Sequence, residues 1–328
     1  MAETIALVGG ETMLGREIVE VFGETRLGQQ LKLVAAEDEE AGKLTELSGA
    51  PALLSKLEPD AVEDADILIL SGSKKSSRQA LETKPPGLII DLTGVTEEET
   101  DAQLRSPLNE AAEYRSDMTG PQVVAHPAAT AIALILAKLH PAHMIRRAIV
   151  HVFEPASERG KAGIEELQQQ TVNLFALQPL PKKVFDAQAS FNMLARWGSD
   201  AAGSLAEVEE RIERHLASLL DRTDGVPMPS LRLIQAPVFH GYTFSFWVDF
   251  DESVTAEEIE EALAGELIDV RTAEVEAPDN VGAAGQRGVI VGAIAPDRNS
   301  ANAFWIFAAA DNFRIAAENA ALIAQEAA

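Results

Sequence analysis

The sequence contains no cysteine, which excludes disulfide bonds, thiolate metal sites and thiol nucleophiles. Only six histidines are present. Because they lack the spacing of metal ligands, we expect no metal site. Basic residues are outnumbered, since 27 Lys and Arg stand against 52 Asp and Glu for a net charge of −25. A negative field of this size repels nucleic acid and anionic membranes, so we expect neither as a partner.

Long apolar runs are also missing, and no stretch of the sequence approaches the roughly 20 residues that span a bilayer. The first residues carry acids and lead directly into an apolar segment, a pattern unlike a signal or transit peptide. These features predict a cytoplasmic protein. The 328 residues, 46% of them hydrophobic, are enough for two domains with a core each.

The first part of the chain alternates between apolar runs and amphipathic segments. Strands are predicted at residues 5–8, 31–37, 65–72, 87–94 and 122–127. The continuous apolar run within 65–72 is typical of a parallel strand that is covered on both faces. Strands that alternate with helices predict an α/β domain with a Rossmann-like doubly wound parallel sheet.

The second part has longer strands and longer amphipathic helices. Strands are predicted at 146–155, 230–250, 287–297 and 302–311, and helices at 160–177, 205–220, 253–265 and 312–328. The helix at 253–265 is expected to use Thr255 as its N-cap. This pattern predicts an α+β domain with a mostly antiparallel sheet.

A glycine-containing turn follows the first strand and precedes a helix. Gly9, Thr12 and Gly15 recur every three residues, as in turns that aim backbone N–H groups and a helix N-terminus at a pyrophosphate. The dinucleotide fingerprint has glycine at the middle position, where this chain has Thr12. Two interpretations remain open: a dinucleotide-binding turn, or a tight strand-to-helix turn that no longer holds a nucleotide. The candidate cofactor contacts are Gly9, Gly10, Thr12, Met13, Leu14 and Gly15.

Acidic residues cluster after the second strand, from Glu37 to Glu40. The candidate among them is Glu37. A carboxylate at this position can accept hydrogen bonds from the ribose hydroxyls of NAD, whereas it would repel the 2′-phosphate of NADP. Any bound dinucleotide is therefore expected to be NAD rather than NADP. The other interpretation of the cluster is a solvated acidic loop.

The order of several segments resembles the aspartate-semialdehyde dehydrogenase family across essentially the whole chain. The segments are the opening turn, the acidic stretch, "IIDLTG" (89–94), "VVAHPAATAIA" (123–133), "APVFHGYTFSFWV" (236–248) and "AAADNFRIAAENAALIA" (308–324). This family reduces an acyl phosphate to an aldehyde with NADPH, through a thioester on cysteine. The resemblance implies a dinucleotide-binding-like domain at 1–125, a dimerising domain at 126–310, and a C-terminal helix at 311–328 that packs back on the first domain.

The resemblance also places the catalytic roles of the family on residues that cannot perform them. Ala129 stands at the nucleophile, where a helix N-terminus would activate a thiol. Ala128 replaces the preceding asparagine. Thr130 has a hydroxyl nearby, but the sequence shows nothing that would activate it.

The remaining roles are replaced in the same way. Glu154 stands for the glutamine that orients the substrate carbonyl, and Gln235 for the arginine that clamps the substrate carboxylate. Tyr242 stands for the acid/base histidine, while His240, two residues earlier, is expected to face the same side of the strand. On the cofactor side, Glu39 stands where a residue meets the 2′-phosphate.

This set of replacements is similar to that of the Usg-type homologues, which keep the family fold without its cysteine. We therefore expect the parent activity to be absent and no cofactor to be required. The first hypothesis is a non-catalytic dimer with a structural or regulatory role. A second is an enzyme of altered chemistry that uses His126, Glu154, His240 and Tyr242, with Glu154 as the base. A third is a sensor that binds NAD and reports it through the dimer.

The residues of the second hypothesis can also have purely structural roles. His126 precedes a proline and can be a surface or capping residue, and Tyr242 can be an aromatic residue that packs in a sheet. The resemblance implies a homodimer, and the aromatic segments 244–247 and 304–307 are typical of interface or domain cores. A heterodimer with an active relative is a further alternative.

Overall fold

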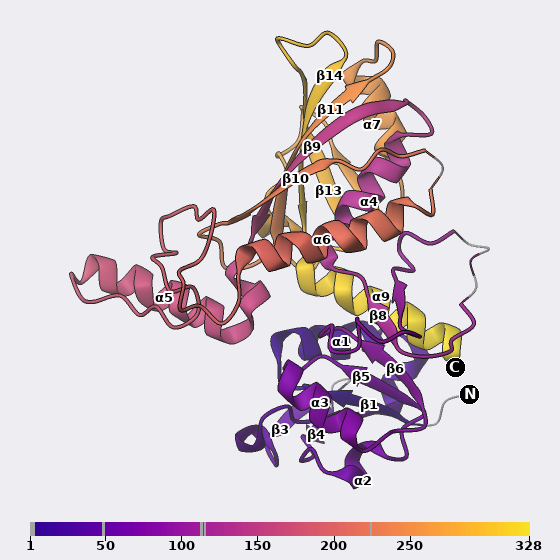
Figure 1. The fold of residues 1–328 in the computed structure, drawn as a ribbon, viewed down its shortest axis with the longest axis vertical. Coiled ribbons are helices and arrows are strands. Elements are labelled where there is room, and N and C mark those ends of the chain that lie inside the picture. The colour runs from indigo at the N-terminus through magenta and orange to yellow at the C-terminus, as the bar shows by residue number, and fades with distance from the viewer. Residues whose placement is uncertain (1–3, 48–49, 112–113, 115, 224) are drawn as a thin grey trace. The chain divides into compact units, whose positions relative to one another are not determined.

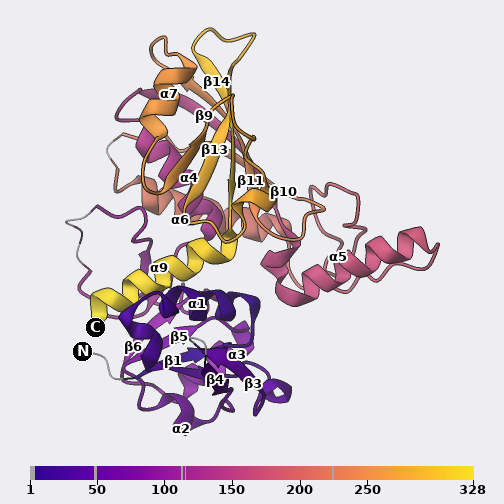
Figure 2. The ribbon, with the colours of Figure 1, turned by 180° about the vertical axis from the view of Figure 1, so that it is seen from behind.

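A computed structural model describes residues 4–47, 50–111, 114, 116–223 and 225–328. The chain forms two compact units. One comprises the residues up to Ala125 together with Ala316–Ala328, and the other comprises His126–Ile315. Figures 1 and 2 show the elements of each unit from opposite sides.

The first unit is built on a parallel sheet, as the alternating pattern predicted. Its strands lie in the order β2 (Leu31–Val34), β1 (Ile5–Val8), β5 (Ile67–Leu70), β6 (Leu88–Asp91), β8 (Gln122–Val124) and β7 (Gln103–Arg105). Every neighbouring pair in this order is parallel. The strand order reverses between β1 and β5, and open α/β sheets in general bind ligands outside the carboxyl ends of the strands at such a switch point.

Short helices and a hairpin complete the first unit. The helices are α1 (Met13–Gly23), α2 (Pro59–Val62), α3 (Lys74–Glu82), the 3-10 turns η1 (Arg26–Gln30) and η2 (Asp38–Glu40), and the C-terminal part of α9 (Asn312–Ala327). The hairpin pairs β3 (Leu44–Leu47) with β4 (Ala50–Leu53). It was not predicted, because its strands are half exposed and lack a continuous apolar run.

Both faces of the parallel sheet are covered, which explains its uninterrupted apolar strands. Ile5 and Leu7 share a core with α1 and with alanines of α9, among them Ala317 and Ala320. Strand residues of the opposite parity, Ala6, Val8, Leu68 and Leu70, pack with Val62 and Ala80 on the other face. Successive strand residues point to opposite faces, so each strand contributes to two cores.

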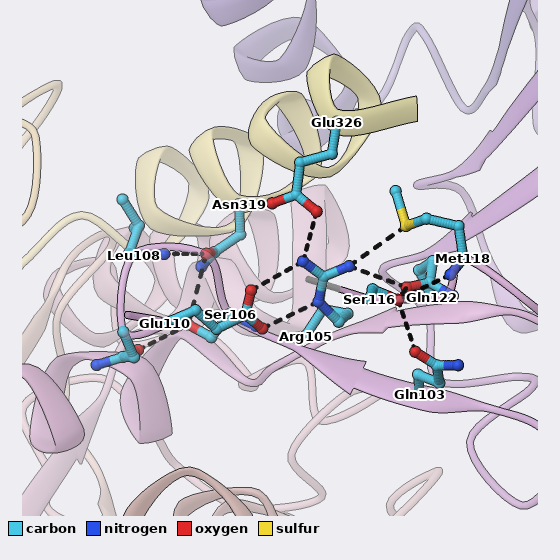
Figure 3. Close-up of polar contacts among 11 residues, drawn as sticks. Gln103, Arg105, Ser106, Leu108, Glu110, Ser116, Met118, Gln122, Asn319 and Glu326 are labelled. Atoms are coloured by element: carbon cyan, nitrogen blue, oxygen red, sulfur yellow. Dashed lines mark hydrogen bonds and ion pairs between the residues drawn. The ribbon is translucent and has the colours of Figure 1, made fainter. Parts of the chain in front are cut away.

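A buried arginine ties α9 to the edge of this sheet (Figure 3). Arg105, at the end of β7, is fully buried. Its guanidinium donates to both carboxylate oxygens of Glu110, to Gln122 and to Glu326 on α9. Burial alone would lower the pKa of Arg105, but the bonds and charges of Glu110 and Glu326 outweigh it and raise the pKa above its usual value. The cation is therefore fixed in its charged form.

The second unit contains a mixed sheet. Its strands lie in the order β10 (Ser230–Gln235), β9 (Ile145–Glu154), β11 (Tyr242–Phe250), β14 (Ala303–Ala310), β13 (Val289–Pro296) and β12 (Ile268–Arg271). The three central pairs are antiparallel and the two outer pairs are parallel. The predicted α+β domain with a mostly antiparallel sheet is confirmed, and its parallel edges were not foreseen.

Helices of the second unit gather mainly on one face of this sheet (Figures 1 and 2). They are α4 (Pro127–Leu139), α6 (Leu205–Leu220) and α7 (Ala256–Leu263), with the short α8 (Asn280–Ala283) and η3 (Ala156–Arg159) in connections. Helix α5 (Gly160–Phe175) extends away from the sheet in both views. Thr255 caps α7 in a capping box with Glu258, as predicted.

The prediction of one strand over 230–250 was wrong. Strand β10 ends at Gln235 and β11 begins at Tyr242. The connection contains Pro237, which cannot donate to a sheet, and Gly241, whose φ of 83° breaks the extended backbone. His240 therefore lies outside the strand, and its expected alignment with Tyr242 on one strand face does not exist.

The predicted aromatic segments split between core and surface. Phe244, Phe246 and Phe304 are buried, whereas Trp305 is 40% exposed. Trp247 lies directly opposite Trp305 on the neighbouring strand. Both indole N–H groups donate to one carboxylate, that of Asp297, so this aromatic pair is held in a fixed orientation.

Candidate functional site

The residue expected at the nucleophile lies in the first turn of α4. Ala129 is fully buried, and so is Ala128 beside it. Pro127 opens the helix, where its missing N–H costs nothing. The turn has the form that would activate a thiol, but it presents only methyl groups where the thiol would stand.

His126 is the N-cap of this helix. The ring Nδ1 of His126 accepts a hydrogen bond from the backbone N–H of Ala128 at 3.2 Å. The backbone N–H of His126 donates to Nδ1 of His215 at 2.9 Å. The side chain is buried, with Nε2 4.0 Å from the carboxylate of Glu158. The capping interpretation of His126 therefore describes its place in the fold.

Glu154 ends β9 and is fully buried. A guanidinium nitrogen of Arg159 lies 3.5 Å from one carboxylate oxygen, yet neither oxygen accepts a hydrogen bond from any described residue. Burial raises the pKa of Glu154 to about 7, against the opposing charge of Arg159 and with the support of Glu158. Near pH 7 this side chain is therefore present in both its charged and its neutral form.

Gln235, at the end of β10, is buried with its amide fully used. Its Nε2 donates to the backbone oxygens of Glu154 and Ala236, and its Oε1 accepts from the indole N–H of Trp197 at 3.2 Å. A side chain committed to three partners within its own unit has little capacity left for a substrate carboxylate.

Tyr242 is the first residue of β11 and is 1% exposed. Its ring stacks on Phe244 with a centroid distance of 5.7 Å and meets the ring of His126 edge-on at 6.1 Å. Its hydroxyl finds no hydrogen-bond partner among the described residues. Burial, and after it the charges of Glu158 and Glu154, raise the pKa of this hydroxyl well above its usual value. Tyr242 is therefore a packed, neutral phenol.

His240 belongs to a polar network instead of the strand. Its Nε2 lies 2.9 Å from the carboxylate of Asp311, and its Nδ1 lies 3.1 Å from the hydroxyl of Ser157. Asn312 donates to Ser157 and to Glu158. Burial alone would raise the pKa of Asp311, but the bond and charge of His240 outweigh it, and the pKa lies below its usual value. The network fixes the loop before β11 to the start of α9.

Two residues at the centre of this cluster were not predicted. The guanidinium of Arg159 lies over the ring of Trp197, 4.9 Å from its centroid, and Trp197 also holds Gln235. The indole lines a cavity of about 300 Å³, which is bounded mainly by residues 195–199 and 203–206. Arg159 could have been identified from the sequence, because the adjacent charged residues Glu158 and Arg159 come just after the end of a predicted strand. Trp197 lies in an irregular segment without such a signal.

The glycine turn of the first unit is tightly packed. Gly9 has a φ of 96°, and a Cβ there would lie 2.6 Å from Cα of Gly72, in the turn after β5. A Cβ on Gly15 would lie 2.0 Å from the oxygen of Gly9. Thr12 caps α1, accepting from the N–H of Gly15 and donating to the oxygen of Gly9. The turn therefore packs against the chain at the switch point of the sheet, and Thr12 is hydrogen-bonded within the turn itself.

The donors that remain for a phosphate in this turn are few. The N–H groups of Gly9 and Gly10 donate to Val34, whereas Met13 and Leu14 open α1, where N–H groups have no intrahelical acceptor. The N-terminus of α1 thus offers backbone N–H donors in this turn.

Acidic residues gather in the connection after β2. A carboxylate oxygen of Glu11 accepts from the backbone N–H groups of Ala36 and Glu37 at 2.7 and 3.3 Å. Glu37 is exposed in the connection between β2 and η2, and Asp38 and Glu39 follow it within η2. These carboxylates make the connection negatively charged.

Within the described ranges, no group of three or more histidine, aspartate or glutamate side chains could hold a metal ion. Among the helices of these same residues, none is long and apolar enough to cross a membrane.

The first unit has a parallel sheet with a glycine turn at its switch point. The second unit has a mixed sheet and the helix α4, whose first turn follows β8. Together these features define a two-unit protein of the dehydrogenase type. Residues 136–315 match the family described as "Semialdehyde dehydrogenase, dimerisation domain". The chain belongs to the semialdehyde dehydrogenase family.

Relatives of two kinds resemble the full chain. The aspartate-semialdehyde dehydrogenase of Rickettsia bellii is 24% identical over 98% of this chain and 96% of its own length. A USG-1 protein homolog of Azotobacter vinelandii is 29% identical over 94% of this chain and 93% of its own. The predicted family is thereby confirmed, with USG-1 homologues among the relatives.

Solved structures share the fold. A probable aspartate-semialdehyde dehydrogenase from Pseudomonas aeruginosa has a TM-score of 0.83 at 24% identity, covering 99% of this chain and 98% of that one. The aspartate-semialdehyde dehydrogenase of Candida albicans, solved with NADP, has a TM-score of 0.65 at 12% identity, covering 100% and 98%. That protein binds NADP, the cofactor that the acidic stretch of this chain is expected to disfavour.

Proposed function

We propose that this chain is a homodimeric member of the semialdehyde dehydrogenase family that does not perform thioester chemistry. The observation that carries the proposal is Ala129, buried in the first turn of α4 in a sequence without any cysteine. Gln235 supports it, because its amide is bonded to Trp197 and to backbone oxygens. The domain description that matches residues 136–315 supports the dimer.

The test of this proposal is an activity measurement on the purified chain. Aspartate semialdehyde, phosphate and either NADP or NAD would be supplied, with an active family member as the positive control. We expect no reduction of the dinucleotide above the blank. Reduction of the dinucleotide above the blank by the purified chain would contradict the proposal.

A second candidate function is altered chemistry at Glu154. It is supported by a carboxylate with a pKa of about 7 whose oxygens accept no hydrogen bond from the described chain, since such a group can exchange protons near neutral pH. His126 and Tyr242 would contribute a ring contact and a neutral hydroxyl. A crystal soaked with small carbonyl compounds tests it: a ligand within 3.5 Å of Glu154 is required, and an empty site would contradict it.

For the first unit, we propose that the glycine turn binds NAD in preference to NADP, as a sensor would require. The free N–H groups at the start of α1 support pyrophosphate binding, and the acids around Glu37 oppose a 2′-phosphate. No catalytic step depends on this binding. A heterodimer with an active family member is a further proposal, which co-purification of the two differently tagged chains would test.

A further inference from the structure

A glutamate of the glycine turn contacts the connection that follows the neighbouring strand. Glu11 lies between the end of β1 and the start of α1. Its Oε1 accepts from the backbone N–H of Ala36 at 2.7 Å and from that of Glu37 at 3.3 Å. The carboxylate therefore links two connections at the edge of the parallel sheet where the strands end.

The register of the sheet brings these two connections together. Strands β1 and β2 are parallel neighbours, and Val8 at the end of one lies opposite Val34 at the end of the other. The N–H groups of Gly9 and Gly10 both donate to the oxygen of Val34. These bonds hold the turn against the end of β2, so that Glu11, the next residue, lies beside the chain that leaves this strand.

The connection after β5 packs closely against both, because β5 lies on the other side of β1. A Cβ on Gly72 would lie 2.8 Å from the Cβ of Ala36. The hydroxyl of Thr12 lies 3.3 Å from the oxygen of Ser71. A side chain at position 72 would therefore clash, and glycine lets the three connections approach one another around the carboxylate of Glu11.

The two N–H groups that Glu11 takes form an anion-binding arrangement, since successive backbone N–H groups that converge on one point attract a negative charge. The chain itself supplies the anion. Hydrogen bonds from N–H groups to a carboxylate are stronger than those between neutral groups. The second oxygen, Oε2, is buried and accepts no hydrogen bond from the described residues. An unpaired carboxylate oxygen therefore remains beside the occupied donors.

These donors lie where a dinucleotide-binding sheet distinguishes NAD from NADP. In such sheets the chain just after the second strand contacts the adenosine ribose: an acid bonds its hydroxyls, or an arginine accommodates a 2′-phosphate. Residues 35–42 contain acids but no arginine or lysine. A 2′-phosphate would thus meet N–H groups that are already bonded, and beside them a carboxylate of its own sign.

We propose that Glu11 is the residue that excludes NADP, because its carboxylate takes the backbone donors that a 2′-phosphate would need. The proposal rests on the dinucleotide binding put forward above and deepens it by naming a specificity-determining residue outside the acidic stretch. The exposed acids from Glu37 to Glu39 act through solvent, where salt screens them, whereas Glu11 acts by direct contact. An unphosphorylated ribose carries no charge, so this carboxylate does not oppose NAD.

The test is calorimetric titration of NAD and of NADP into the wild-type chain, E11A, E11Q and the control E63A. E11A frees both N–H groups, whereas E11Q removes the charge and keeps an acceptor oxygen. Glu63 is exposed at the end of α2, shortly before β5 begins, so E63A removes one carboxylate of the same unit away from the turn. Hydrogen exchange at the amide of Ala36 reports the contact without any ligand.

We expect E11A to lower the NADP dissociation constant by about tenfold or more, and to change that of NAD by about threefold at most. The gain in E11Q should be smaller, because its amide oxygen can still accept from the two N–H groups. E63A should bind as the wild type does. Exchange at Ala36 should be about tenfold faster in E11A than in the wild type or E63A.

The outcomes separate this proposal from the dinucleotide binding on which it rests. An unchanged ratio of the two dissociation constants in both E11A and E11Q would overturn the role of Glu11 and leave NAD binding intact. An equal gain in E63A would overturn it too, since the loss of any carboxylate would then suffice. Unchanged exchange at Ala36 in E11A would show that the contact is absent in solution. Heat from neither dinucleotide with any of these proteins would overturn dinucleotide binding itself, and the role of Glu11 with it.

Discussion

The guanidinium of Arg105 lies 2.8 Å from the carboxylate of Glu326, a residue 221 positions further along the chain. Arg105 is fully buried, whereas the Glu326 side chain is 36% exposed. The second carboxylate on this cation belongs to Glu110, which is almost completely buried. The contact joins the last turn of α9 to the strand at the edge of the parallel sheet, so the C-terminus is part of the first unit.

R105M is expected to destabilise the first unit by about 3–5 kcal/mol, because the Glu110 carboxylate would stay buried without its cation. E326Q removes only a partly exposed charge and should cost about 1 kcal/mol or less. Hydrogen exchange at the amides of residues 316–327 measures both effects. Equal protection of α9 in R105M and in the wild type would show that the arginine does not hold this helix.

Glu154 is expected to make stability depend on pH. Burial raises its pKa from 4.5 to about 7 in the folded chain, so the folded state holds this proton more tightly than the unfolded state. The associated stability is complete below pH 4.5 and is lost as the pH rises through 7. Relative to E154Q, the wild type should lose about 3 kcal/mol of unfolding free energy between pH 4.5 and pH 8.

Urea unfolding across this pH range measures the difference between the two proteins. E165Q is the matched control, because Glu165 is exposed on α5 and should leave the pH dependence of the wild type unchanged. Parallel stability curves for E154Q and the wild type would show that folding does not shift the pKa of Glu154.

A129C supplies the missing thiol at its expected position. We expect no dehydrogenase turnover, because Gln235 cannot clamp a carboxylate and Tyr242 is a buried, neutral phenol. The new thiol should also react slowly with a thiol reagent, since Ala129 is fully buried. S199C, at an exposed position, is the reactive control. Turnover in A129C would mean that the other replacements are compatible with the parent chemistry.

Calorimetric titration with NAD and with NADP tests the glycine turn. We expect NAD to bind more tightly, because the acids after β2 repel a 2′-phosphate. E39R should lower the ratio of the NADP to the NAD dissociation constant by about tenfold, since one charge reversal near a phosphate is worth about 1.4 kcal/mol. E82R, on the exposed end of α3, is the control. Heat from neither dinucleotide would mean that the turn serves only the architecture.

Sequence patterns predicted the elements that have a strong periodicity. The strand at Ile5–Val8 and the helix capped by Thr255 were placed correctly, because a continuous apolar run and a cap each act locally. The hairpin β3–β4 was missed because its exposed strands lack an apolar run, and the parallel strand β12 was missed because it is short and pairs with the later strand β13. The single strand over 230–250 was wrong because one glycine and one proline outweighed its aromatic content.

The candidate site shows the same division. The resemblance alone assigned Ala129, Glu154, Gln235 and Tyr242 to the family's catalytic positions, and these assignments stay predictions. The exclusion of a thiol nucleophile followed from the absence of cysteine. The partners of these residues could not be predicted. The bond from Trp197 to Gln235 joins residues that are far apart in sequence, and no local pattern records it.

The sequence by itself determined what chemistry is absent, the order of strands and helices, and the acidic character of the chain, because these depend on residue identity and local spacing. Only the tertiary structure decided that burial raises the pKa of Glu154 to about 7, that His240 lies beside Asp311, and that Phe175 of α5 lies against Phe191. The physical reason is that burial, hydrogen bonding and pKa depend on neighbours that folding brings together from distant positions.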